Sequence, residues 1–153
     1  MTTVPMDLTQ TFPRSPRERI GGYAHLARMT DKARSKAAGT LGEYIYPCPL
    51  DEMLLEFLGV SSEAFSEAAG SCADDKLVDW IALRALRRSP QEIEDWNRRF
   101  LARKPRNEES LRRFLEIRGR IAPSRTDITT WPDLLDLEEG REVPLRTGDA
   151  LPP

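Results

Sequence analysis

Apolar residues recur at helical spacing along most of this sequence, and glycines and prolines divide it into short segments. In residues 23–38, Leu26, Met29, Ala33 and Ala37 fall on one face, which is typical of an amphipathic helix. The helix that starts at Asp74 is apolar on most sides, which predicts a central position in the fold. The same spacing predicts further helices that end at Gly59, Gly70, Pro105, Pro123 and Gly140.

Two short motifs of the same form predict helix starts. In SPRE (15–18) and SPQE (89–92), the serine can cap a helix, the proline suits its first position and the glutamate can reach back to the cap. We therefore expect helices to begin at Ser15 and at Ser89. Asn107 is the predicted cap of the next helix.

A strip of different character, GEYIYPCPLD (42–51), interrupts the helical pattern. A residue before proline is pushed out of helical geometry, so Tyr46 and Cys48 should be extended. In an extended chain Tyr44, Tyr46 and Cys48 project from one side. We expect the strip to fold back along the preceding helix.

These elements predict an all-α fold: a single compact domain of about six or seven helices, with one short extended Tyr/Pro strip after the first long helix. The expected boundaries are an extended arm over 1–13, the helical domain over 14–140 and a loose tail over 141–153.

Composition excludes several classes of protein. Hydrophobic residues make up 39% and charged residues 31% of the chain, its net charge is −2, and no apolar run is long enough for a membrane span. The start of the chain does not resemble an export signal, so we expect a cytoplasmic protein with free thiols. One histidine and two scattered cysteines fit no zinc motif, and no phosphate-binding glycine loop is present, so we expect neither a metal nor a cofactor.

The candidate chemistry lies on the helix before the strip, where Arg28, Asp31 and Lys32 share a face with Arg34 nearby. The favoured interpretation of this cluster by itself is a solvated helix face. The alternative is an anion clamp, in which arginine grips a carboxylate or phosphate. Arg14 and Arg17 form a charged entrance before this helix.

The segment from Arg84 to Arg120 holds 12 basic and 6 acidic residues. Because the two signs alternate on amphipathic helices, a solvated surface is favoured over a nucleic-acid interface.

The run DLTQTFPRSPRERIGGYAHLARMTDKARSKAAGTLGEYIYPCPLD, with SPQEIEDWN and TWPDLLDLEEGR, resembles the bacterial family called Domain of Unknown Function 5069. The resemblance covers 7–141 and implies a small helical protein without an assigned activity.

We expect the chain to bind a small anionic molecule between the first long helix and the strip, with or without acid–base chemistry. The expected ligand-binding residues are Arg28, Asp31, Tyr44, Tyr46, Arg14 and Arg17, and the catalytic candidates are Asp31, Lys32, Tyr44, Tyr46 and Cys48. The alternatives are a non-catalytic protein-interaction module, in which these residues are internal struts, and a weak RNA-binding module.

Overall fold

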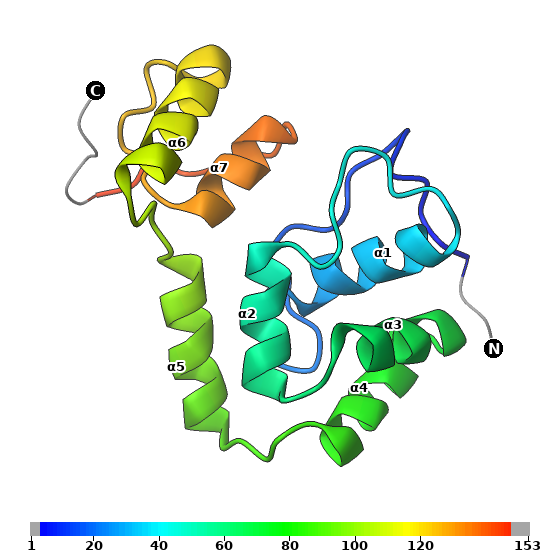
Figure 1. Cartoon of the computed structure of the whole chain (residues 1–153). Helices are drawn as coiled ribbons and strands as arrows, with labels where there is room; N and C mark the ends of the chain where they lie inside the picture. Colours follow the sequence, from blue (N-terminus) through cyan, green and yellow to red (C-terminus); the bar gives the residue numbers. More distant parts are fainter. Residues whose placement is uncertain (1–3, 148–153) are drawn as a thin grey trace. The chain divides into compact units, whose positions relative to one another are not determined.

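The computed structural model describes residues 4–147 and contains seven helices and no strand in that range (Figure 1). The predicted all-α class is therefore confirmed. The helices are α1 (Leu26–Ala37), α2 (Pro49–Leu58), α3 (Ser62–Ser71), α4 (Asp74–Arg84), α5 (Pro90–Leu101), α6 (Glu108–Ile121) and α7 (Trp131–Glu138).

The described residues form two compact units, the first ending at Asp95 and the second beginning at Trp96. In the first unit α1 packs against α3 and α3 packs against α4. In the second unit α6 packs against α7 around a core of Phe114, Ile128, Leu134 and Val143. None of the described helices combines the length and apolar character that a bilayer span requires.

The helix starts that depend on local capping are confirmed. The Glu92 N–H donates to Ser89 Oγ at 3.1 Å, and the Ser89 N–H donates to Glu92 Oε1 at 3.0 Å, which is a complete capping box at the start of α5. Asn107 Oδ1 accepts from the Ser110 N–H at 2.8 Å and caps α6. Gly59 ends α2 in the left-handed conformation that glycine tolerates.

The predicted helix start at Ser15 is wrong. Ser15 Oγ accepts from the Arg17 N–H at 3.0 Å and closes a local turn, which competes with helix formation. The first helix instead begins at Leu26, after Gly21 and Gly22 have both taken positive φ. Its N-cap, His25, has φ 68° and is the only non-glycine residue of positive φ among residues 4–147.

The predicted central position of α4 is also wrong. Within α4 only Leu77 and Ile81 are buried, and Leu83 is 84% exposed. The central helix of the first unit is α1, in which every residue from Leu26 to Ser35 is buried. The sequence of α1 hides this because its buried positions include four charged side chains.

The segments that flank the helices are attached to them. The Leu8 N–H donates to the Thr40 carbonyl at 2.8 Å, and Arg146 forms two bonds to Asp133 at 2.9 and 3.0 Å. The predicted arm and tail boundaries at 13/14 and 140/141 stay predictions, and residues 1–3 and 148–153 lie outside the described residues.

Candidate functional site

Four of the five charged residues of α1 are buried. Arg28, Asp31 and Lys32 are each 3% exposed and Arg34 is 8% exposed, so the favoured interpretation of a solvated helix face is wrong. An ionised side chain inside a protein requires an opposite charge or hydrogen bonds. Each of these four side chains is accordingly held by an opposite charge or a hydrogen bond.

Lys32 belongs to a network centred on the carboxylate of Asp51. Lys32 Nζ lies 2.7 Å from Asp51 Oδ2, and His25 Nε2 lies 2.7 Å from Asp51 Oδ1. Asp51 Oδ2 also accepts from the Cys48 N–H at 2.9 Å. Three donors thus converge on one completely buried carboxylate: one from the N-cap of α1, one from the middle of α1 and one from the N-cap of α2.

The protonation states of this network follow from its geometry. Burial by itself would raise the pKa of Asp51, but the hydrogen bond from His25 and the charges beside it hold that pKa well below its ordinary value. Burial lowers the pKa of His25, so its imidazole is neutral at pH 7. Since Asp51 is ionised, His25 Nε2 carries the ring proton and donates it to the carboxylate.

Cys48 lies at the edge of the same network. Its side chain occupies the N-cap of α2, where Sγ accepts from the Asp51 N–H, and Lys32 Nζ lies 3.2 Å from Sγ. Burial raises the pKa of the Cys48 thiol, and the charge of Asp51 raises it further, while Lys32 and the Asp51 N–H oppose the shift. The thiol therefore keeps its proton at neutral pH and has two donors ready for the thiolate.

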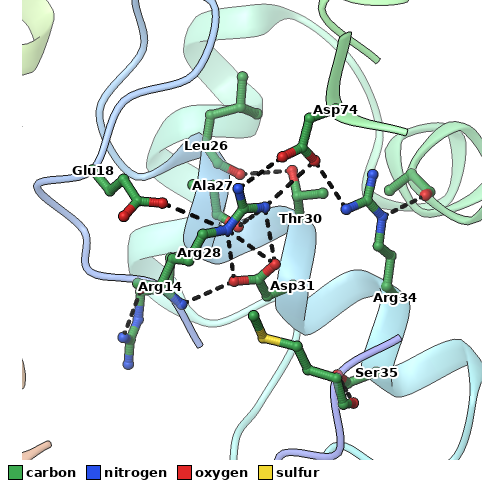
Figure 2. Close-up of polar contacts among 12 residues, drawn as sticks. Arg14, Glu18, Leu26, Ala27, Arg28, Thr30, Asp31, Arg34, Ser35 and Asp74 are labelled. Carbon is green, nitrogen blue, oxygen red and sulfur yellow. Dashed lines mark hydrogen bonds and ion pairs between the residues drawn. The ribbon is translucent and has the colours of Figure 1, made fainter. Parts of the chain in front are cut away.

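A second network lies around Asp31 (Figure 2). The Arg14 guanidinium donates to Asp31 from Nε at 3.0 Å and from Nη2 at 3.0 Å, and the Arg14 N–H adds a bond at 2.9 Å. Arg14 Nη1 also donates to Asp74 Oδ2 at 2.7 Å. Arg14 thus joins a residue of α1 to the first residue of α4.

Arg34 completes this second network. Its Nη1 donates to Asp74 Oδ1 at 2.9 Å, and its other nitrogens donate to the carbonyls of Ala69 and Cys72 at 2.8 and 2.9 Å. Burial opposes ionisation of Asp74, but the hydrogen bonds from Arg14 and Arg34 lower its pKa. The two arginines share one carboxylate, so α1, α4 and the end of α3 are tied together.

The segment 42–48 lies along α1, and its side chains meet cations of that helix. The Arg28 guanidinium lies 5.6 Å from the centre of the Tyr44 ring, and Lys36 Nζ donates to the Tyr46 carbonyl at 2.8 Å. Arg28, Lys32 and Lys36 are four residues apart, so one face of α1 presents three cations to this segment.

The Tyr46 side chain is directed to the start of α3. Its hydroxyl donates to the Ser62 carbonyl at 2.8 Å, away from Arg28 and Asp31, and the side chain is 4% exposed.

The backbone of Cys48 is extended as expected, with φ −91° and ψ 172°. Arg17 lies in the turn after Pro16, where its N–H donates to Ser15.

Four residues of these networks were not among the predicted site residues: His25, Arg34, Asp51 and Asp74. One of them had a usable signal. CPLD (48–51) has the same form as SPQE, with a capping residue, a proline and an acid three residues after the cap. Among residues 4–147, no three His, Cys, Asp or Glu side chains are placed to hold a metal ion.

A comparison with protein families agrees with the resemblance seen in the sequence. Residues 10–141 match the family model described as Domain of unknown function (DUF5069). No curated protein matches the chain.

Proposed function

The chain belongs to the family described as Domain of unknown function (DUF5069), and we propose that it binds a small anion where α1 meets the segment 42–48 and transfers a proton to it from Cys48. The observation that carries this proposal is the contact of 3.2 Å between Lys32 Nζ and Cys48 Sγ at the start of α2.

Positive charge on this face of α1 favours an anion. Lys36 is exposed, and its contacts within residues 4–147 are the carbonyl and the ring of Tyr46, both of which are neutral. Lys32 lies one turn before it and is anchored on Asp51. A carboxylate or phosphate near Lys36 would gain a charge-assisted hydrogen bond.

The sulfur of Cys48 holds a proton that it can supply to a bound molecule. Its raised pKa keeps the proton on the thiol at neutral pH, and Cys48 is only partly buried. When the proton moves to the bound molecule, the sulfur becomes a thiolate that accepts from Lys32 and from the Asp51 N–H. Both bonds strengthen with the negative charge, which lowers the cost of proton transfer.

In this proposal His25 and Asp51 are positioning residues. Asp51 fixes the Lys32 ammonium through Oδ2 and is itself fixed through Oδ1 by the His25 N–H. Arg14 and Arg34 have a similar supporting role for α1 through Asp31 and Asp74. These two arginines hold α1 in place. Within the part of the chain that the structure describes, neither of them forms a hydrogen bond with Cys48.

Anion binding is tested by thermal shift with a panel of small mono- and dicarboxylates and phosphates. A ligand that binds the native state raises the melting temperature by mass action. We expect Lys36→Gln to reduce the shift, whereas Lys76→Gln, which removes an exposed lysine of α4, should leave it unchanged. If no compound shifts the wild type, the same side chains are internal struts of a non-catalytic protein.

The role of Cys48 is tested by the pH dependence of its alkylation with iodoacetamide. The Cys48 peptide of the chain unfolded in urea, followed by mass spectrometry, is the reference. We expect the Cys48 rate to rise at higher pH in the folded protein than in the unfolded chain, and Lys32→Met to move that rise higher still, because the cation no longer favours the thiolate. An identical profile with and without Lys32 would remove Lys32 from the mechanism.

A further inference from the structure

A cavity of about 280 Å³ lies in the first unit, at residues that the polar networks do not use. It is lined by Gly21 and Tyr23 before α1, by Leu26 at the start of α1, by one side of α4, and by residues 85–88 and Ile93. Figure 1 shows α4 and the chain that follows it, which supply most of this lining. Cys48, Lys32 and Lys36 do not belong to the lining, so the cavity is distinct from the site at Cys48.

The walls of the cavity are mainly apolar. Leu26 and Ile81 form its buried part, and Leu86, which is 55% exposed, forms part of its rim. Val78 and Ile93 are half-buried and add further apolar surface. An alkyl or aryl group that entered from the surface would remove these side chains from water, and that burial favours binding.

Two arginines supply a positive end. Arg88 is fixed by a bond from Nη2 to the Phe57 carbonyl at 3.0 Å and lies 4.4 Å from the centre of the Phe57 ring. Its Nε is buried and has no hydrogen-bond acceptor among residues 4–147. The Arg88 side chain is 26% exposed, so a ligand carboxylate at this end of the cavity would lie beside its guanidinium and gain a charge-assisted interaction.

The charge balance at this end favours a single negative charge. Arg88 forms a long ion pair with Glu92, in which Nη1 lies 3.8 Å from Oε2. Arg87 is exposed and forms no ion pair within the described part of the chain. One positive charge therefore stays uncompensated, which matches a carboxylate better than a doubly charged phosphate.

We propose that this cavity binds a small amphipathic carboxylate, with its alkyl or aryl group between α4 and Ile93 and its carboxylate at Arg87 and Arg88. The volume sets the size of the ligand. A water molecule occupies about 30 Å³, so the cavity holds about nine atoms of that size, which is the size of a medium-chain fatty acid.

The probe is octanoate, titrated into the isotope-labelled whole chain and followed by amide and methyl NMR shifts. We expect saturable shifts at Val78, Ile81, Leu86 and Ile93. Octanol has nearly the same apolar group without the charge and should bind about tenfold more weakly. Octylamine, of opposite charge, should bind more weakly than octanol.

Three variants locate the site. Arg87→Gln should weaken octanoate binding about threefold, whereas Arg84→Gln, which removes an exposed cation of α4 outside the cavity lining, should not change it. Ala82→Phe places a ring at an exposed lining position, so it should abolish binding while the protein stays folded.

Equal binding of octanoate, octanol and octylamine would overturn the assignment, since it would show adsorption to exposed apolar surface. Saturable octanoate binding that survives Ala82→Phe would place the ligand elsewhere and would also overturn it. Neither result bears on Cys48, whose alkylation profile is measured without octanoate.

Discussion

Lys32 and Asp51 form an ion pair at 2.7 Å in which neither side chain is more than 4% exposed. Two charges at this depth lose most of their hydration, and their mutual attraction and the bonds from His25 and Cys48 compensate for that loss. Removing one partner leaves the other charge buried without its counter-charge. This relationship determines how α1 responds to substitution.

We expect Lys32→Met to destabilise the protein by about 3–5 kcal/mol, because Asp51 then lacks a cation. Asp51→Asn should cost less in the Lys32→Met background than in the wild type, with a coupling of about 1–3 kcal/mol. Urea unfolding of the wild type, both single variants and the double variant gives this cycle. Strictly additive costs would mean that the pair is not coupled.

The stability of the protein should fall as the pH drops below about 6.5, the ordinary histidine pKa. Burial lowers the pKa of His25 in the folded state, so below pH 6.5 the unfolded chain takes up a proton that the folded chain does not. The decline is at most about 1.4 kcal/mol per pH unit from this one group.

Urea unfolding at pH 7.5, 6.5 and 5.5 measures this decline, and His25→Asn is the matched control. Asparagine tolerates the left-handed backbone at this position and does not titrate, so the decline should flatten. His25 is the single histidine of the chain, so its NMR titration is unambiguous. A folded-state pKa of His25 at or above 6.5 would contradict the prediction.

Asp51 also contributes to the pH dependence of stability, but in a different pH range. Because its pKa is lowered in the folded state, its contribution to the free energy of unfolding is complete above about pH 4 and is lost only at lower pH.

Tyr46→Phe should cost about 0.5–1.5 kcal/mol, because the hydroxyl loses its bond to the Ser62 carbonyl while the ring stays packed. Tyr46→Ala should cost about 3–5 kcal/mol, since it also empties the space of a buried ring. Thermal melts of the three proteins test this order. Equal costs for the Phe and Ala variants would show that the ring contributes nothing to packing.

Ser89→Ala should destabilise the protein by about 1 kcal/mol, because the Glu92 N–H at the start of α5 loses its acceptor. Ser89→Thr keeps a hydroxyl at the cap and should behave like the wild type. Chemical unfolding of both variants distinguishes the cap from other effects of substitution. A threonine variant as unstable as the alanine variant would argue against capping by the hydroxyl.

Local chemistry explains what could be predicted from the sequence. The caps at Ser89 and Asn107 and the stop at Gly59 depend on neighbours within a few residues, so the pattern was sufficient there. Ser15 has the same motif, but Gly21 and Gly22 follow it and the serine closes a turn instead. At Ser15 the backbone conformation of the following residues, and not the local capping motif, therefore determined whether a helix begins.

The polar networks could not be predicted because their bonds join distant residues. Asp31 meets Arg14 across 17 positions, His25 meets Asp51 across 26, and Arg14 meets Asp74 across 60. Helical spacing shows which residues of α1 share a face, but it does not show whether that face is covered. The four buried charges of α1 therefore looked like surface positions until their partners were known.

The two carboxylates that compensate Lys32 and Arg34 impose an order on biosynthesis. Translation produces α1 before Asp51 and Asp74, so Lys32 and Arg34 lack these counter-charges until the later segments emerge from the ribosome. A nascent helix with these charges stays hydrated, because dehydration without a partner is too costly. Only after residue 74 has left the exit tunnel can α1 become the interior helix of its unit, so the first helix of the chain is enclosed no earlier than the start of the fourth.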